Sequence, residues 1–286
     1  MRRRISESNI FPTFNLFEEY KKTEYLISEN QIIGTYNQFG KPLSPQFTIE
    51  SYVDQLYFTN WNLRGSFLST DEMRAGLGIA KGNFNKQSIN ENMVLDFCQY
   101  AANINMRAIM TIGKCPVAYI SDTSYFKTVV DNMSLLLDQL GAHFLTDNKT
   151  REVCIAYNDE LSSVVGVDFP EIESSLAEYK KIDNRGDLKR KGEILCTLFK
   201  KMEAEESKFK GTTYKNICDD TMFLFNKIGA RHWVAKDRIA SKTFMAMSPD
   251  ELVLWYDRTY DMFLSCMVIS RYLAIKKDID AIKRTE

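Results

Sequence analysis

Apolar residues repeat at helical spacing in the middle of the chain. From position 126 they fall at i, i+3, i+4, i+7, i+10, i+11 and i+14, as Phe126, Val129, Val130, Met133, Leu136, Leu137 and Leu140. Side chains at these spacings share one face of an α-helix. The segment 122–140 is therefore predicted to be a helix with a continuous apolar stripe, and Gly141 supplies its end.

Other segments carry similar helical signals. Helices are predicted over 15–28, 90–108, 170–182, 187–203 and 212–228, and a further run begins at Thr48. Ser69 and Glu72 read as a capping box, and Ser248, Pro249 and Glu251 mark the start of a long helix to about residue 276. Only 142–145 and 152–157 are rich in β-formers, with turn residues between them, which predicts a small hairpin.

These signals give a mostly α fold class. The chain has only 13 glycines and 6 prolines among 286 residues, which is typical of helices joined by short loops. We expect a helical bundle with one small β-hairpin, preceded by an irregular, aromatic-rich N-terminal helical region. The break at Pro116 places the domain boundary between residues 1–117, of unknown role, and residues 118–286. A single continuous core is the alternative.

Charge and hydropathy bear on location. Lys and Arg number 37 against 38 Asp and Glu, and this balance argues against attraction of the whole protein to nucleic acid or an anionic membrane. It leaves open a local basic patch. The longest apolar stretch, 262–270, is shorter than a membrane span, so we expect no membrane partner. No apolar segment of a signal peptide follows the basic residues 2–4, and we expect a cytoplasmic protein with reduced cysteines.

The cysteines and histidines give no metal signal. Six cysteines are widely spread and lack CxxC spacing: Cys98, Cys115, Cys154, Cys196, Cys218 and Cys266. The two histidines are His143 and His232, and no phosphate-binding loop or dinucleotide fingerprint is present. We therefore expect no metal and no cofactor, with most cysteines serving as small apolar core residues.

One segment near the C-terminus carries groups suited to chemistry. Asn226 lies near the end of the predicted helix 212–228, and Arg231 and His232 follow it, before the long helix that starts at Ser248. In metal-independent RNA cleavage a base takes the 2′-hydroxyl proton, a cation stabilises the phosphorane and a polar group positions the phosphate. Histidine suits the first role and arginine the second. The same segment is basic, and its candidates for phosphate contact are Lys236, Arg238 and Lys242.

Three short motifs resemble a known family. They are 188–195 (LKRKGEIL), 225–232 (FNKIGARH) and 248–260 (SPDELVLWYDRTY). Their order is similar to that in the C-terminal domain of bacterial abortive-infection proteins related to the HEPN helical domains, over roughly residues 122–276. The resemblance implies an antiviral effector that acts on RNA as a metal-independent endoribonuclease, often as a homodimer. It carries over Asn226, Arg231 and His232 as catalytic residues.

The motif departs from the family in one respect. HEPN ribonucleases place four to six residues between the catalytic Arg and His, whereas Arg231 and His232 are adjacent. Adjacent side chains on a helix diverge by about 100°, so a loop conformation or a dimer is needed to bring these two onto one phosphate. The alternative interpretation is a structural Arg-His pair that anchors the loop. The protein is then a non-catalytic sensor or adaptor that binds a protein partner, such as a phage component or a toxin or antitoxin mate.

Other candidate groups have simpler interpretations. The lysines and arginines between positions 180 and 215 alternate with glutamates, which favours a solvated mixed-charge helix face over an RNA track. The aromatic residues Tyr52, Tyr57, Phe58, Trp61 and Phe67 are interpreted as core rather than as a surface for stacking on bases. His143, at the predicted hairpin, is interpreted as structural.

Overall fold

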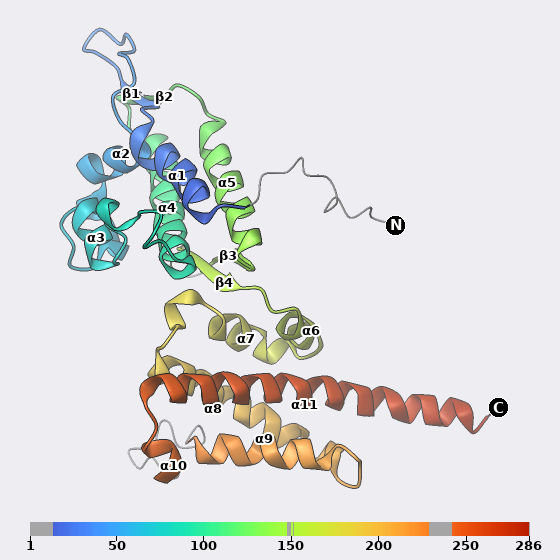
Figure 1. The fold of residues 1–286 in the computed structure, drawn as a ribbon. Helices are drawn as coiled ribbons and strands as arrows, with labels where there is room; N and C mark the ends of the chain where they lie inside the picture. The colour runs from blue at the N-terminus through green and yellow to red at the C-terminus, as the bar shows by residue number, and fades with distance from the viewer. Residues whose placement is uncertain (1–13, 148–149, 151, 229–241, 286) are drawn as a thin grey trace. The chain divides into compact units, whose positions relative to one another are not determined.

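The computed structural model describes residues 14–147, 150, 152–228 and 242–285. Within them the chain is mostly α-helical, with two small two-stranded sheets, and the predicted fold class is confirmed (Figure 1). The chain divides into two compact units, residues 1–155 (unit 1) and 156–286 (unit 2). None of the described helices is long and apolar enough to cross a membrane.

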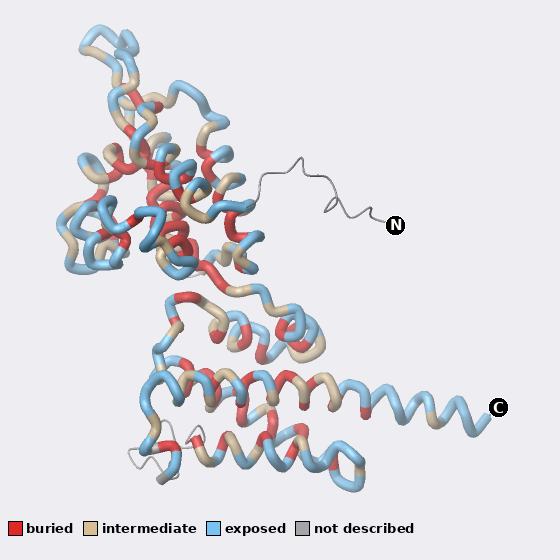
Figure 2. Tube along the Cα trace, viewed as in Figure 1, coloured by how far each residue is buried: buried red, intermediate tan, exposed pale blue. Residues whose placement is uncertain are grey.

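Unit 1 holds most of the N-terminal helices. Its elements are α1 (Leu16–Glu24) followed by a π-helical turn (Tyr25–Glu29), β1 (Ile33–Thr35), α2 (Ile49–Leu56), α3 (Thr70–Gly76), α4 (Glu91–Ile112), β2 (Ala118–Ile120), α5 (Tyr125–Gln139), β3 (Ala142–Thr146) and most of β4 (Val153–Tyr157). Short 3₁₀ turns lie at Phe58–Asn60, Asn62–Arg64 and Lys81–Asn83. Buried residues follow α4 along its length (Figure 2). Of the five aromatic residues predicted to be core, Tyr52, Phe58 and Trp61 are buried, whereas Tyr57 and Phe67 are only partly buried.

The division between the units differs from the predicted boundary at 117/118. Helix α5 belongs to unit 1, because Phe126, Val129 and Met133 are buried there. Its polar side chains also contact α1 and the turn after it: Asn132 Nδ2 donates to Thr23 Oγ1 at 2.8 Å, and Tyr125 Oη donates to the Leu26 carbonyl at 3.1 Å. Pro116 therefore marks a turn within unit 1 rather than a linker.

A small sheet joins residues far apart in the sequence. β1 and β2 are antiparallel, with Ile33 opposite Ile120, Gly34 opposite Tyr119 and Thr35 opposite Ala118. A side chain at position 34 would meet the Tyr119 ring, because a Cβ there would lie 2.6 Å from it. Three-residue strands show no alternating pattern, so this sheet was not among the predicted elements.

The predicted hairpin is confirmed as β3 and β4. Between the strands the Asp147 amide donates to the Glu152 carbonyl at 2.8 Å. The hairpin is fastened to α4, because the Gln99 side chain accepts from the Ile155 amide at 2.8 Å and Asn103 bonds both backbone groups of Val153.

Unit 2 is a helical bundle. Its elements are α6 (Glu160–Asp168), a 3₁₀ turn (Pro170–Ile172), α7 (Glu173–Tyr179), a second such turn (Ile182–Asn184), α8 (Leu188–Glu205), a third (Glu206–Phe209), α9 (Lys215–Lys227), α10 (Lys242–Met245) and α11 (Pro249–Lys283). Helices α8, α9 and α11 pack around one core that includes Leu195, Phe199, Phe225, Phe263 and Met267. The buried residues of α11 lie between Tyr256 and Leu273, and Figure 2 shows the C-terminal part of the helix exposed.

Helix caps explain where several helices begin. Ser248 accepts from the Glu251 amide, and the Glu251 carboxylate accepts from the Ser248 amide, so the predicted capping box of α11 is confirmed. Ser69 caps α3 as predicted, but Glu72 accepts from the amide of Leu68 rather than from that of Ser69. Helix α11 continues to Lys283, beyond the predicted end near residue 276.

A buried carboxylate ties the end of α8 to α11. Glu205 is 5% exposed and contacts Lys201 (Oε1–Nζ 2.9 Å), Lys208 and the Ser270 hydroxyl. Burial alone would raise its pKa, but the hydrogen bonds from these three groups outweigh burial and lower the pKa to about 2. The ionised form of Glu205 therefore stabilises unit 2.

We expect the stability of unit 2 to be acid-sensitive through Glu205. The pKa is lower in the folded state than the ordinary value of 4.5, so the stabilisation is complete above that value and is lost as pH falls toward 2. Glu205→Gln should lower the free energy of unfolding at neutral pH by roughly 1–3 kcal/mol and flatten its dependence on acid. Urea unfolding across this pH range measures both, with the exposed Glu203→Gln as control. Equal acid dependence in wild type and Glu205→Gln would contradict the assignment.

Candidate functional site

Asn226 is the only predicted catalytic residue that the structure describes. It lies in the last turn of α9, on the exposed side, while its neighbour Phe225 is fully buried. Its Nδ2 donates to the Met222 carbonyl at 2.9 Å, one helical turn back. The amide donor is thus used within α9, and the side chain stays at the surface.

The other residues of the predicted site lie largely outside the described part of the chain. Arg231, His232, Lys236 and Arg238 fall between residues 229 and 241, which the structure does not describe. Lys242 is the first residue of α10.

Buried aromatic side chains anchor the chain on both sides of this segment. Before it, the Phe225 ring packs between those of Phe199 and Phe263, with centroid distances of 5.3 and 6.2 Å, and Ile228 is 4% exposed. After it, Phe244 is buried and its ring meets Trp255 edge-on at 5.6 Å. Figure 1 shows the C-terminal end of α9, α10 and the start of α11 at one end of unit 2. The bundle thus holds both flanks of the basic segment at that end.

A polar cluster joins the first and last of the three motifs. Lys191 of α8 is 7% exposed, and its Nζ lies 2.5 Å from Oδ1 of Asp257 on α11. The same oxygen accepts from the Tyr179 hydroxyl at 2.9 Å. The ammonium of Lys191 also lies 4.8 Å from the centroid of the Tyr179 ring, which stacks on Tyr260 at 4.1 Å. Two segments that are far apart in the sequence, 188–195 and 248–260, are thus in contact through these side chains.

A second ion pair flanks the stacked tyrosines. Lys180 Nζ lies 3.0 Å from Asp159 Oδ2 and 4.7 Å from the centroid of the Tyr260 ring, and the Tyr260 hydroxyl donates to Ser162 Oγ at 3.0 Å. Burial, followed by the charge of Asp257, raises the pKa of Tyr179, so its phenol stays protonated. Both lysines are balanced by carboxylates. The cluster fastens α6, α7, α8 and α11 together.

The basic residues along α7 to α9 mostly face carboxylates, as predicted. Lys181 pairs with Glu178 at 2.6 Å, and Arg190 pairs with Glu178 and Glu193 at 3.3 and 3.1 Å. Lys215 pairs with Asp219 on the next turn. These contacts support a mixed-charge surface rather than a continuous basic track.

Four of the six cysteines are core side chains, and the described residues form no metal-binding group. No group of three or more His, Cys, Asp or Glu in the described ranges could hold a metal ion. All six cysteines are free thiols, and four are buried. Burial raises the pKa of Cys98 to about 12 and that of Cys218 to about 11, so these thiols are protonated core residues. His143 lies on β3 and is exposed.

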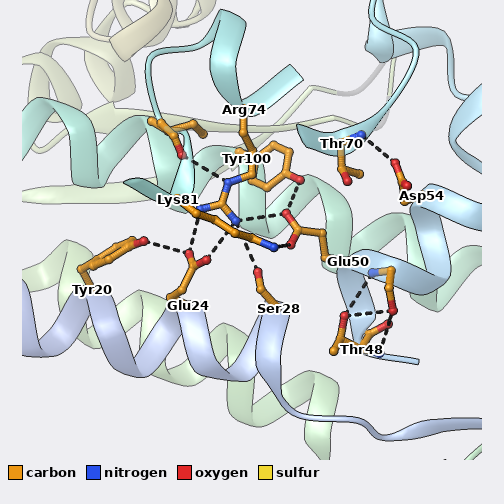
Figure 3. A network of polar contacts seen from close by, with 12 residues as sticks. Tyr20, Glu24, Ser28, Thr48, Glu50, Asp54, Thr70, Arg74, Lys81 and Tyr100 are labelled. Atoms are coloured by element: carbon orange, nitrogen blue, oxygen red, sulfur yellow. Dashed lines mark hydrogen bonds and ion pairs between the residues drawn. The ribbon is translucent and has the colours of Figure 1, made fainter. Parts of the chain in front are cut away.

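The most unusual side chain of unit 1 is a buried arginine on α3. Arg74 is 1% exposed, and its guanidinium spans two carboxylates (Figure 3). Two of its nitrogens bond Glu24 of α1, at 3.0 and 2.9 Å, and one lies 3.1 Å from Glu50 of α2. Its Nε donates to the Ile79 carbonyl at 3.2 Å. Arg74 thus links three helices and the turn that follows α3.

The carboxylates around Arg74 have further partners. The Tyr20 hydroxyl donates to Glu24 at 3.0 Å, the Tyr100 hydroxyl donates to Glu50 at 2.6 Å, and Lys81 lies 3.2 Å from Glu50. Burial would raise the pKa of Glu50, but Arg74 and Tyr100 outweigh it and the pKa is lowered. Two cations thus balance two carboxylates, and each bond joins side chains of the same unit. The network stabilises unit 1 and leaves little charge for a ligand. The sequence did not predict that Arg74, Glu24 and Glu50 are buried together, because a charged residue in an amphipathic helix is usually exposed.

No protein-family model, curated protein or solved structure matches this chain. Its function is therefore inferred from its own residues and their arrangement.

Proposed function

We propose that this protein is a cytoplasmic antiviral effector of the abortive-infection type that acts on RNA as a metal-independent endoribonuclease. In this proposal Arg231, His232 and Asn226 are catalytic, and Lys236, Arg238 and Lys242 contact phosphates. Support comes from the three motifs that resemble the HEPN-related family. It also comes from the bundle of unit 2, which contains the described residues of all three motifs.

One observation carries the proposal. The basic segment begins after Phe225 and Ile228 and ends before Phe244, and all three side chains are buried in the same core. Functional residues are commonly placed on loops that a rigid scaffold holds at both ends. This arrangement supports a site at the end of the bundle where α9 ends and α11 begins.

The proposed roles follow from the chemistry of the side chains. The imidazole of His232 takes the proton of the 2′-hydroxyl, and the Arg231 guanidinium stabilises the charge on the phosphorane. Because the two are adjacent, convergence on one phosphate requires a loop conformation or the opposing site of a second copy. We include a homodimer in the proposal for this reason, and light scattering of the purified protein measures its mass.

Replacement of the two catalytic residues tests the proposal. Purified wild-type protein should degrade total RNA in the presence of EDTA. The double variant Arg231→Ala/His232→Ala should cut RNA at least about 100-fold more slowly, because loss of a general base alone costs roughly 10²–10⁴-fold. It should also lose the inhibition of bacterial growth that an abortive-infection effector is expected to cause. The matched control is His143→Ala/Arg284→Ala, which removes the other histidine and an exposed arginine. Circular dichroism checks that all variants are folded.

Two outcomes would overturn the proposal. RNA cleavage by the folded double variant at the wild-type rate would remove Arg231 and His232 from the mechanism. RNA left intact by the wild-type protein would contradict the ribonuclease assignment and favour the non-catalytic sensor or adaptor.

A further inference from the structure

One end of unit 1 presents large apolar side chains to solvent. The loop between β1 and α2 projects from the helices of unit 1 (Figure 1). It exposes Phe39 (78%), Tyr36 (40%) and Leu43 (44%), and Val117 beside β2 is 53% exposed. We refer to these four residues, with Lys41 and Lys114, as the apolar tip.

Hydrogen bonds within a tight turn hold Phe39 in this exposed position. The Asn37 carboxamide oxygen accepts from the amides of Phe39 and Lys41, at 2.9 and 3.0 Å, and the Asn37 amide donates to the Lys41 carbonyl at 2.8 Å. Gly40 takes the positive φ of 71° that this tight turn requires. An Asn side chain that bonds the following backbone fixes a turn without burying the residues at its apex. Phe39 is therefore held outward by a structured turn.

The two segments of the tip form one surface. The Tyr36 amide donates to the Val117 carbonyl at 2.9 Å, and the Tyr119 hydroxyl donates to the Leu43 carbonyl. The rings of Tyr36 and Tyr119 lie 5.2 Å apart. Because β1 and β2 are paired, Leu43 and Val117 are held on the same part of unit 1.

The segments that form this end contain basic residues but no acidic ones. Asp and Glu account for 38 of 286 residues, yet none occurs in 30–49 or 97–121, the segments that include the tip. Lys41 and Lys114 are both exposed. The apolar tip thus contains two exposed lysines and no carboxylate, although the net charge of the chain is balanced, and it is a local basic group of the kind that the sequence left open.

We propose that the apolar tip binds the surface of an anionic lipid bilayer. Phe39, Leu43 and Val117 would enter the boundary between headgroups and acyl chains, while Lys41 and Lys114 contact anionic headgroups. A lipid surface is favoured over RNA because the aliphatic side chains gain from burial among acyl chains but do not stack on bases. The proposal needs no membrane-spanning helix: it concerns contact with the bilayer surface, whereas the expectation of no membrane partner depended on the length of the longest apolar stretch.

Vesicle binding of the full-length protein tests the inference. We expect the protein to co-sediment with phosphatidylcholine vesicles that contain one quarter phosphatidylserine, and to bind pure phosphatidylcholine vesicles far more weakly. Removing both lysines in Lys41→Ala/Lys114→Ala should weaken binding roughly 25-fold, since each lysine near an anionic surface contributes roughly fivefold. Phe39→Ser should weaken it severalfold, and high salt should weaken wild-type binding.

Matched controls show whether loss of vesicle binding is specific to the apolar tip or follows from removing any exposed apolar residue or lysine. Leu68→Ser alters an equally exposed residue (75%) elsewhere in unit 1, and Lys86→Ala/Lys127→Ala removes the same charge from other surfaces. Both should bind like wild type. No binding to anionic vesicles, or equal loss in the controls, would overturn the inference, as would tip-dependent binding of single-stranded RNA without vesicle binding. None of these readouts depends on RNA cleavage, so the two proposals fail separately.

Discussion

Arg74→Met is expected to destabilise unit 1 by roughly 3–5 kcal/mol, because it leaves two buried carboxylates without their shared cation. Glu24 and Glu50 are 8% and 3% exposed, so water cannot replace the guanidinium. The free energy of unfolding of a natural domain is only about 5–15 kcal/mol, so this substitution would remove a large part of the stability of unit 1. Urea unfolding gives the free energy, and amide hydrogen exchange should show lost protection in α1, α2 and α3 with unit 2 less affected.

A series of variants tests whether the loss of stability in Arg74→Met comes from the unpaired carboxylates. Arg74→Lys keeps the charge but loses the planar fork that bonds both Glu24 oxygens and Glu50, so it should fall between wild type and Arg74→Met. Adding Glu24→Gln and Glu50→Gln to Arg74→Met should recover part of the loss, since no unpaired charge then remains buried. The exposed pair Lys127 and Asp131 provides the control, and Lys127→Met should cost at most about 1 kcal/mol. Equal cost at positions 74 and 127 would contradict a stabilising role for the network.

Phe225→Ala is expected to destabilise unit 2 by about 3–5 kcal/mol. Phe225 is fully buried, and its ring packs against Phe199 of α8 and Phe263 of α11. Truncation leaves a cavity where three helices meet, and it also releases the end of α9 that precedes Asn226. Hydrogen exchange should show lost protection in α8, α9 and α11, with unit 1 less affected.

Phe223 supplies a matched control on the same helix. Its side chain is 56% exposed, so Phe223→Ala removes the same atoms from the surface and should change the free energy of unfolding by less than about 0.5 kcal/mol. If RNA cleavage is confirmed, Phe225→Ala should reduce it at temperatures where unit 2 is still folded, whereas Phe223→Ala should not. Equal stability of the two variants would show that the end of α9 is not anchored by this core.

The helices were predictable because their signals are local. Asn90, Asp187 and Ser248 each cap a helix by bonding an amide within the next three residues, so the information lies within one turn. The apolar stripes of α5 and α8 likewise depend only on spacing. Helix α6 was not predicted, because its short sequence holds Ser162, Ser163 and Gly166 and shows little periodicity.

The candidate site was predictable only as residue types in a short segment. The structure adds that both flanks of this segment are buried in one core, and that Lys191 and Asp257, which are 66 positions apart, form an ion pair. Residue identity gave no indication that these two side chains meet.

The sequence by itself determined the helical fold class, the starts of most helices, the hairpin and the balanced charge. Each of these depends on neighbours in the chain or on composition. Only the tertiary structure decided that α5 belongs with unit 1, that β1 pairs with β2, that Arg74 is buried between Glu24 and Glu50, and that Phe39 is left exposed. These features depend on which distant segments pack together, because burial and ion pairing are set by contacts across the fold and not by local spacing.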